Sequence, residues 1–279
     1  MSEFKNGDRF AVYVANLGKY NEGESVGAWL ELPVSQAELD RFLSERLGLE
    51  LDPQVAFEKG MRGEPVYEEY AIHDTDISIP DLDIDVSEYS NLSDLNILAA
   101  TLADHQEVNL EAVSLCADQI ASDITPLQYA NLIIQADEIP YYSYDFFGIE
   151  HSGTWSNEEK FGYTLLEDSP VREYLEEHDM FGYFDVEKYG RDNSQNCTLT
   201  DDGYLDNAAD FPDVDFYDRD ELKEIIEDER GEDFFQSLKK VKEKEAKGVS
   251  LADRANDAKA ISADMAQDAP QRSVDIDAR

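Results

Sequence analysis

The residues best suited to chemistry form a short Gly-x-Ser-x-Gly pattern at Gly23, Ser25 and Gly27. In serine hydrolases this motif places the nucleophile on a sharp turn between a strand and a helix. Residues 10–15 alternate in side-chain character as a strand does, but residues 28–33 alternate as well and end in proline. The motif therefore separates two predicted strands. We predict a β-hairpin with a long loop over residues 17–27 rather than a hydrolase site.

Metal-binding patterns are incomplete. Residues 81–92 begin like an EF-hand calcium loop, but Val86 and Leu92 occupy the positions that need glycine and glutamate. Glycine-rich phosphate-binding motifs are missing as well. The four histidines lack a second histidine at helical ligand spacing: His73, His105, His151 and His178. We therefore predict no metal site and no cofactor.

Nucleophilic and acid–base chemistry has equally little support. Cys116 and Cys197 are far apart and outside any Cys-x-x-Cys pattern, which predicts free thiols. Two carboxylates are sufficient for glycosidase chemistry, and a chain with 64 acidic residues cannot refute such a pair. No feature, however, singles out two acids with the raised pKa that a general acid needs. We predict no catalytic residue and a protein that is not an enzyme.

The distribution of charge is the most unusual property of the 279-residue chain. It carries 64 acidic and 23 basic residues, a formal net charge of −41. Residues 63–159, which we call the acidic region, contain 21 acidic residues and no lysine or arginine. Ordinary surfaces intersperse both signs, so this region predicts a single-sign surface that meets a strongly basic partner and repels nucleic acid and membranes.

A general adaptation to salt would also produce an acidic chain. That hypothesis predicts depletion of lysine throughout, yet residues 239–244 contain four lysines. The charge is regional, which favours a surface with a specific role over solubility alone.

Capping signals and apolar periodicity place helices around these residues. Ser35 to Glu38 form a capping box that begins a helix ending at Gly48. Thr125 and Pro126 mark the start of another helix. Three helices are predicted within the acidic region, at about 91–104, 109–122 and 125–134.

Other segments read as strands or loops. Residues 49–65 look irregular, and short strands are predicted at 66–72 and 75–79. Residues 81–85 alternate acidic and apolar side chains, as an exposed edge or a loop does. The aromatic stretch 141–147 is interpreted as a core strand or domain junction, since base stacking would need a cationic groove. Later predictions are a helix at 171–178, a hairpin with an Asp-Gly turn at 197–206 and a helix at 220–230.

These elements predict an α+β fold class. We expect an elongated multi-domain molecule with small antiparallel sheets and helices flanking a central helical bundle domain. The expected units are an N-terminal α/β domain at 1–90, a helical domain at 91–145, a C-terminal α/β domain at 146–230 and a helical or disordered tail at 231–279. No apolar segment resembles a signal peptide or a membrane span, which predicts a cytoplasmic protein.

Three sequence blocks resemble the ArdA antirestriction proteins. They are YVANLGKYNEG at residues 13–23, followed by Gly27 and Trp29; EEYAIHD at 68–74; and EKYGRD at 187–192. Together they anchor residues from about 10 to 230, while extra sequence between Trp29 and Glu68 and a tail of about fifty residues depart from the family. The motif residues interpreted as structural are Asn16, Gly18, Tyr20, Gly23, Gly27, Trp29, Tyr189, Gly190, Arg191 and Asp192.

The resemblance implies a homodimeric DNA mimic from mobile genetic elements that occupies the DNA-binding groove of type I restriction-modification enzymes. Because duplex DNA carries one charge per about 1.7 Å of axis, 41 charges correspond to roughly 70 Å of helix. Carboxylates of residues 64–159 and 167–228 would stand in for phosphates. From the first of these ranges we select sixteen candidate partner-binding acids, called the sampled acids below. They are Glu68, Glu69, Asp74, Asp76, Asp81, Asp83, Asp85, Glu88, Asp94, Asp104, Glu107, Glu111, Asp118, Asp123, Asp137 and Glu138.

An alternative function uses the same electrostatics. An acidic shield or assembly factor for a basic nucleoid or ribosomal protein would also carry a large negative charge. A mimic requires a rigid rod, whereas a shield can be flexible and promiscuous, so molecular shape separates the two.

Overall fold

The computed structural model describes residues 4–144, 155–167 and 169–237. Its first sheet contains β1 (Phe10–Asn16), β2 (Gly27–Glu31) and β3 (Tyr70–Ile77), all antiparallel, in the order β2-β1-β3. The predicted N-terminal hairpin is therefore confirmed. Its loop also contains a short helix, α1 (Leu17–Asn21), because the Asn16 side chain accepts a hydrogen bond from the Lys19 amide and caps it.

Two predictions between residues 49 and 79 were wrong. A single strand, β3, replaces the two short strands, and it stays paired with β1 through a register shift beside Tyr13 and Val14. The segment expected to be irregular contains α3 (Pro53–Met61), which Asp52 caps. Its cap and N1 proline are ordinary helix signals, but Phe57 is 69% exposed, so the helix lacks the buried stripe that periodicity detects.

The predicted helix after Ser35 is present in two parts. It begins as α2 (Gln36–Arg41) with the complete Ser35–Glu38 capping box and continues as a π-helical turn at Phe42–Arg46. Gly48 follows with φ of +72°, a left-handed conformation that glycine adopts without steric cost. The π-helical turn was not predicted, because capping and apolar spacing look alike in both helix types.

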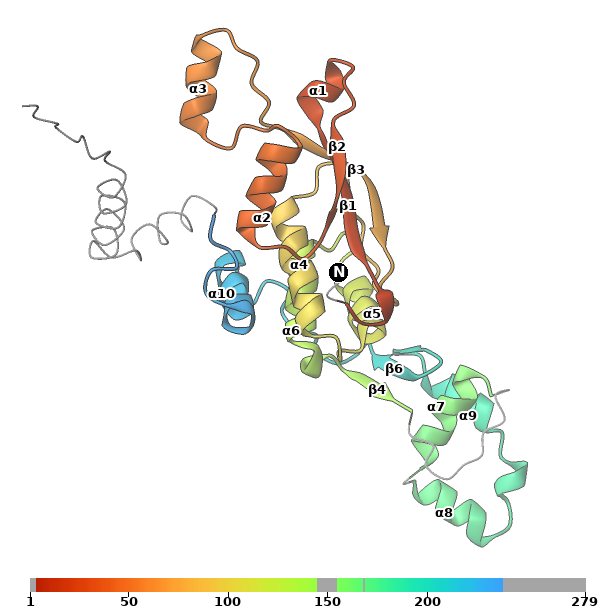
Figure 1. Cartoon of the computed structure of the whole chain (residues 1–279). Helices are drawn as coiled ribbons and strands as arrows, with labels where there is room; N and C mark the ends of the chain where they lie inside the picture. Colours follow the sequence, from red (N-terminus) through yellow and green to blue (C-terminus); the bar gives the residue numbers. More distant parts are fainter. Residues whose placement is uncertain (1–3, 145–154, 168, 238–279) are drawn as a thin grey trace, which may run out of the picture.

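The three helices of the acidic region are confirmed as α4 (Leu92–Asp104), α5 (Leu110–Ile120) and α6 (Pro126–Ile134). Asn91, Asn109 and Thr125 cap them. Helix α4 is buried on nearly all sides, since it packs between the first sheet, the other two helices and α10 (Arg219–Arg230) (Figure 1).

A second antiparallel sheet contains β4 (Tyr141–Ser143), β5 (Cys197–Leu199) and β6 (Gly203–Asp206), in the order β4-β6-β5. The β5–β6 hairpin confirms the prediction for residues 197–206. Only the first part of the predicted 141–147 strand is described, because residues 145–154 lie outside the described ranges.

Beyond this sheet lie α7 (Asn157–Leu166), α8 (Pro170–Glu177) and α9 (Val186–Asn193) (Figure 1). Helix α8 was predicted, whereas α7 and α9 were not. Short helical turns also occur at Lys5–Gly7, Ala136–Glu138 and Phe181–Tyr183.

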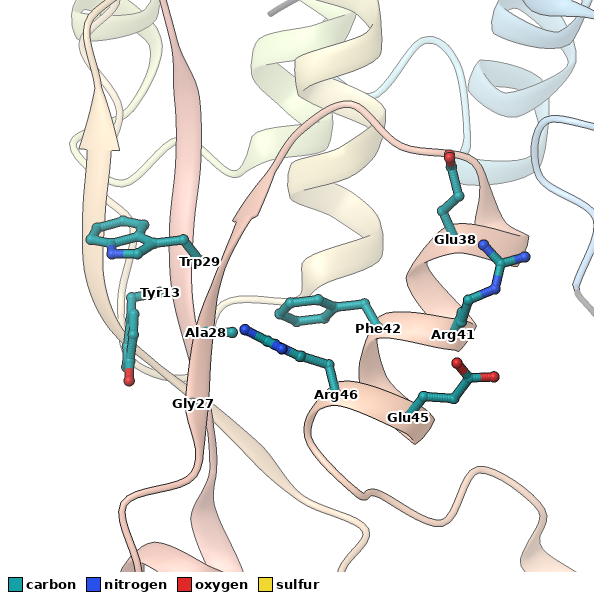
Figure 2. Close-up of a pocket in the computed structure, with 9 residues that line it drawn as sticks. All are labelled: Tyr13, Gly27, Ala28, Trp29, Glu38, Arg41, Phe42, Glu45 and Arg46. Atoms are coloured by element: carbon teal, nitrogen blue, oxygen red, sulfur yellow. The ribbon is translucent and has the colours of Figure 1, made fainter. Parts of the chain in front are cut away.

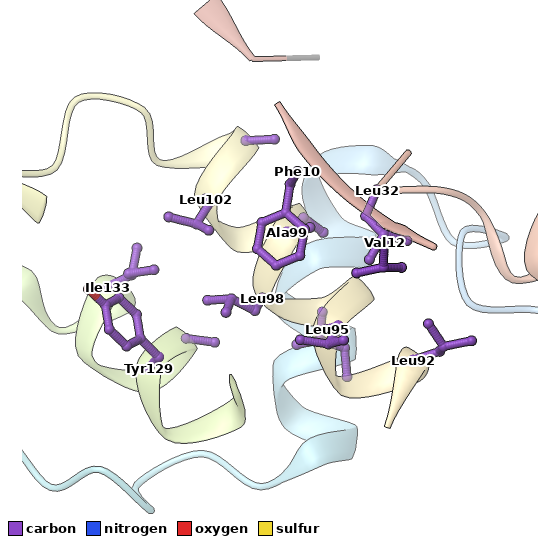
Figure 3. Packing of buried hydrophobic residues seen from close by; sticks show 14 of the residues in the cluster. Phe10, Val12, Leu32, Leu92, Leu95, Leu98, Ala99, Leu102, Tyr129 and Ile133 are labelled. Atoms are coloured by element: carbon purple, nitrogen blue, oxygen red, sulfur yellow. The ribbon is translucent and has the colours of Figure 1, made fainter. Parts of the chain in front are cut away.

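Buried apolar side chains form a cluster that joins the two sheets to α2, α4, α5, α6 and α10, whereas the buried Phe161, Leu166 and Val186 of α7 and α9 lie outside it. Figure 3 shows Phe10 and Val12 of β1 against Leu95 and Leu98 of α4, and the cluster extends to Leu222 of α10. The structure is thus a mixed helix and strand protein with small antiparallel sheets, as predicted. The elongated multi-domain arrangement and its boundaries stay predictions, and the predicted tail from 238 onward lies outside the described residues.

Candidate partner-binding surface

The Gly-x-Ser-x-Gly motif lies in a loop between a helix and a strand. Ser25 is exposed and follows α1, and β2 begins at Gly27. This is the reverse of the strand-to-helix order that a nucleophile elbow requires. The geometry therefore gives Ser25 no support as a nucleophile.

Residues 81–88 form what we call the acidic segment. It is a loop in which Leu82, Ile84 and Val86 pack against the apolar cluster, while the carboxylates between them are exposed. Asp81 begins the segment with φ of +60°, a conformation that aspartate tolerates better than most residues. The intervening apolar contacts hold alternate carboxylates toward solvent.

Hydrogen bonds fix both ends of the acidic segment. The Ser114 hydroxyl on α5 donates to the carbonyl oxygen of Asp81 at 2.5 Å. The Ile72 amide of β3 donates to the carbonyl oxygen of Glu88 at 2.9 Å. The segment is thereby held to the sheet at one end and the helices at the other, which reduces the conformational entropy that a binding partner would have to remove.

Most of the sampled acids are exposed. Twelve of the sixteen are open to solvent, and only one of these, Glu107, pairs with a cation, Lys5, within the described part of the chain. The other eleven have no ion pair among the described residues. They are Glu68, Glu69, Asp74, Asp81, Asp83, Asp85, Glu88, Asp118, Asp123, Asp137 and Glu138.

The remaining four acids make contacts inside the protein. Asp76 pairs with Arg9 across the first sheet. Asp94 and Asp104 on α4 pair with Arg219 and Arg230 of α10 at 2.8 and 2.7 Å. Sequence reasoning missed these partners, because arginines more than 120 positions away supply the charge.

The fourth contact joins α5 to the second sheet. The Tyr141 hydroxyl donates to Glu111 Oε2 at 2.8 Å, and the Thr200 hydroxyl donates to the same oxygen at 3.2 Å. Burial is the main cause that raises the pKa of Tyr141 to about 12, and the Glu111 carboxylate adds to the shift. Glu111 therefore acts as a hydrogen-bond acceptor within the fold.

Burial also affects Asp94. It raises the pKa of the Asp94 carboxyl, and the Arg219 guanidinium opposes that shift without cancelling it. The side chain is only 15% exposed, so its charge is less accessible to a partner than those of the acidic segment. The structure thus separates carboxylates that maintain the fold from carboxylates that face solvent.

The first motif block surrounds the N-terminal hairpin. Asn16 is fully buried, and its side chain joins the α1 amide of Lys19 to the carbonyl oxygen of Leu47 at 3.0 Å. A Cβ on Gly18 would lie 2.6 Å from the Tyr67 ring, and one on Gly27 would lie 2.7 Å from the Tyr13 ring. Only glycine fits at these two positions without movement of a neighbouring side chain.

The other positions of this block lie nearer the surface. Gly23 has φ of +87°. Tyr20 is 54% exposed and contacts His73 edge-on, and Trp29 is 43% exposed and contacts Tyr13 in the same way.

The third motif block lies on α9, where it faces α7. A Cβ on Gly190 would lie 1.8 Å from the carbonyl oxygen of Glu158, so the two helix backbones are in direct contact there. Tyr189 packs edge-on against Phe184, whereas Arg191 and Asp192 form exposed ion pairs within α9. The block is therefore placed at a close helix–helix crossing.

The described residues lack two further features, a metal-binding cluster and a membrane-spanning helix. No group of three or more histidine, cysteine, aspartate or glutamate side chains there is placed to hold a metal ion. No described helix is long and apolar enough to cross a membrane.

The chain was compared with known protein families and with curated proteins. No curated protein matches the chain. The family model described as antirestriction protein (ArdA) matches residues 12–206, from β1 to the end of β6. The match includes all three motif blocks and the acidic region, and it ends before α10. Because it covers more than half of the sequence, the chain belongs to the ArdA family of antirestriction proteins.

Proposed function

We propose that this protein is a DNA mimic that occupies the DNA-binding groove of type I restriction-modification enzymes and protects incoming mobile DNA. The observation that carries the proposal is the run of 97 residues without a basic residue, in which eleven sampled carboxylates are exposed and have no described cation partner. Membership of an antirestriction family supports the same function.

The mechanism is competition by occupancy. Exposed carboxylates of the acidic segment, of β3 and of the loops around α5 and α6 take the place of phosphates against lysines and arginines of the enzyme. Long-range attraction accelerates the encounter, and release of counterions from the basic groove favours binding. No covalent bond changes, and the protein acts stoichiometrically in the cytoplasm.

The same proposal includes an elongated, rigid shape and a homodimer formed through the C-terminal unit. Apolar side chains that are unusually exposed on α8 and the turn after it support such an interface. They are Val171 at 44%, Tyr174 at 56%, Met180 at 48% and Tyr183 at 90% exposure. Sedimentation and solution scattering measure both mass and shape, and a compact monomer at micromolar concentration would contradict this part of the proposal.

The central test is displacement of DNA from a purified type I methyltransferase core. Labelled duplex with the recognition site is bound to the enzyme, and the protein is titrated in at several salt concentrations. We expect stoichiometric displacement that weakens steeply with salt, because charge contacts dominate. Absence of displacement by the folded protein at low salt would reject the mimic.

A charge-matched pair of variants tests the surface itself. The first neutralises the acidic segment by Asp81→Asn, Asp83→Asn, Asp85→Asn and Glu88→Gln. The control neutralises Asp253, Asp257, Asp264 and Asp268 to asparagine, outside the family match, and so has the same net charge. At roughly 0.2–1 kcal/mol per exposed contact, the four substitutions of the first variant lower the affinity by about 4-fold to about 1,000-fold, while the control changes little.

A further inference from the structure

The edge of the first sheet at β2 pairs with no further described strand and lies beside a cavity of about 810 Å³ between β2 and α2. Figure 2 shows the side chains of Phe42 and Arg46 extending from the helix toward Ala28 of the strand. None of the residues that line the cavity is among the acids proposed above to bind the partner.

The backbone of β2 presents unused hydrogen-bonding groups at this edge. The Asn16 amide donates to Val26 O at 2.9 Å, and the Leu32 amide donates to Phe10 O at 2.8 Å. Because the two sides of an antiparallel strand alternate, the even-numbered residues 26–32 bond to β1. Gly27, Trp29 and Glu31 therefore direct their N–H and C=O groups outward, and no described residue bonds to those groups.

The cavity also carries two arginines in an otherwise acidic molecule. Arg41 and Arg46 line it, and neither guanidinium forms an ion pair or a side-chain hydrogen bond with any described residue. Two acids share the lining, but Glu38 is committed to the capping box, where it accepts from the Ser35 amide and hydroxyl. Glu45 also lines the cavity and, like both arginines, is exposed. Two guanidiniums thus keep their full capacity to bind carboxylates.

An open strand edge beside cationic side chains fits an extended acidic segment, which would add as a further strand and pair its carboxylates with the arginines. The chain itself contains such a segment. Residues 273–277 read Ser-Val-Asp-Ile-Asp, with Val274 and Ile276 alternating with Asp275 and Asp277. This alternation is typical of a strand with one apolar and one polar face.

The described chain ends beside the cavity. The Gln36 amide at the start of α2 donates to the carbonyl oxygen of Phe234 at 2.7 Å, and the last described residue is Ser237. From Gln36 to Arg46 the helix covers about 15 Å. The 36 positions between residues 237 and 273 would span about 33 Å even as a random coil, so the segment reaches the cavity easily.

We propose that residues 273–277 of the same chain dock on the β2 edge as an added strand, with Asp275 and Asp277 bound by Arg41 and Arg46. Attachment to the same chain gives the segment an effective concentration in the millimolar range, which allows a short strand to stay bound.

Hydrogen–deuterium exchange of the full-length protein tests the docking. The Trp29 and Glu31 amides have no acceptor without the segment, so docking slows their exchange at least tenfold. Asp275→Asn with Asp277→Asn abolishes this protection, and Ile276→Pro abolishes it without a change of charge. Asp264→Asn with Asp268→Asn is the matched control and leaves protection intact.

Charge reversal separates a specific pairing from loss of folding. Arg41→Glu with Arg46→Glu removes protection, and adding Asp275→Lys with Asp277→Lys restores it. Fast exchange of Trp29 and Glu31 in the unmodified protein, or protection that none of the tail variants changes, would overturn the proposal. Protection that rises with protein concentration would also overturn it, because it would assign the edge to a second copy.

Discussion

Individual acidic residues differ in what surrounds them, although they look alike in the sequence. Asp94 and Asp104 are about 85% buried beside arginines, whereas the carboxylates of the acidic segment alternate with anchored apolar residues and face solvent. A carboxylate that is already paired within the fold has little to offer a basic partner. Neutralising individual acids should therefore affect either stability or binding, according to their surroundings.

The two cysteines should differ sharply in reactivity. Cys116 is fully buried, and burial raises the pKa of its thiol to about 11, so on the order of one in a thousand is thiolate at pH 8. The pKa of the half-buried Cys197 thiol is raised as well, mainly by burial and to a smaller extent by the negative charge of Asp206. With a disulfide reagent we expect only the Cys197 thiol to be labelled in the native protein, and slowly. After unfolding we expect both thiols to be labelled. Rapid labelling of a folded Cys197→Ser variant would contradict the buried position of Cys116.

The Tyr141 hydroxyl should stabilise the fold in a pH-dependent way. Its folded pKa of about 12 lies above the ordinary value of 10. The contribution is therefore complete below pH 10 and is lost as pH rises toward 12. We expect Tyr141→Phe to lower the free energy of unfolding by roughly 1–2 kcal/mol at pH 8 and to match the unmodified protein near pH 12, by urea denaturation. Equal differences at both pH values would contradict the raised pKa of Tyr141.

Elements depend on contacts that their own sequences do not reveal. Helices α7 and α9 cross where Gly162 and Gly190 bring the backbones together, and α10 packs on α4 through two ion pairs and the buried Leu222 and Ile226. Neither α7 nor α9 was predicted from apolar periodicity, because α7 buries only Phe161, Gly162 and Leu166 and α9 is mostly exposed. A close glycine contact replaces the broad apolar stripe in joining them.

Gly190→Ala should separate α7 from α9. The new methyl group would meet the carbonyl oxygen of Glu158, which belongs to the backbone and cannot rotate away. We expect a loss of about 1–3 kcal/mol in unfolding free energy, or separate unfolding of residues 156–206 in hydrogen exchange. Gly182→Ala is the control, because a Cβ there has nothing within 4 Å. Equal stability of the two variants would contradict the crossing.

The Arg230–Asp104 pair should matter more than a surface pair. Their side chains are 12% and 13% exposed, so Arg230→Gln leaves a largely buried carboxylate without its cation. We expect a loss of roughly 2–4 kcal/mol by chemical denaturation. Lys188→Gln breaks a pair whose side chains are 64% and 59% exposed, and should cost less than about 0.5 kcal/mol. A small effect of Arg230→Gln would mean that the Arg230–Asp104 pair contributes little to holding α10 on α4.

The whole molecule carries a net charge of −41, and this charge opposes compaction as well as attracting a basic partner. Because most of these carboxylates are exposed, salt should screen their mutual repulsion. At 0.15 M ionic strength the screening length is already about 8 Å. Stability and partner binding should therefore respond to salt in opposite directions.

Thermal unfolding tests this expectation at the scale of the molecule. We expect the melting temperature to rise by several degrees between 10 mM and 0.5 M sodium chloride, whereas displacement of DNA from a type I enzyme weakens over the same range. Potassium chloride at equal ionic strength should act alike, since the effect is screening. A melting temperature that falls with salt would show that internal ion pairs outweigh the repulsion.

Features that depend on local chemistry could be predicted from the amino-acid sequence. Capping residues and apolar spacing predicted α2, α4, α5, α6, α8 and α10, turn residues predicted both hairpins, and motif blocks indicated the family. These signals are legible because a cap, a turn or a stripe is completed by residues close together in the chain. The uneven distribution of charge along the chain also follows directly from the positions of acidic and basic residues in the sequence.

Residues of the same type have different roles in the folded protein, and these roles could not be predicted from the sequence. Asp94 and Asp104 are paired because α10 returns to α4, and Gly190 is restricted because α7 lies against it. Arg41 and Arg46 line the cavity beside the β2 edge, where no described acid forms an ion pair with them. Each outcome depends on contacts between segments that lie far apart in the chain, and such long-range contacts leave no local pattern in the sequence.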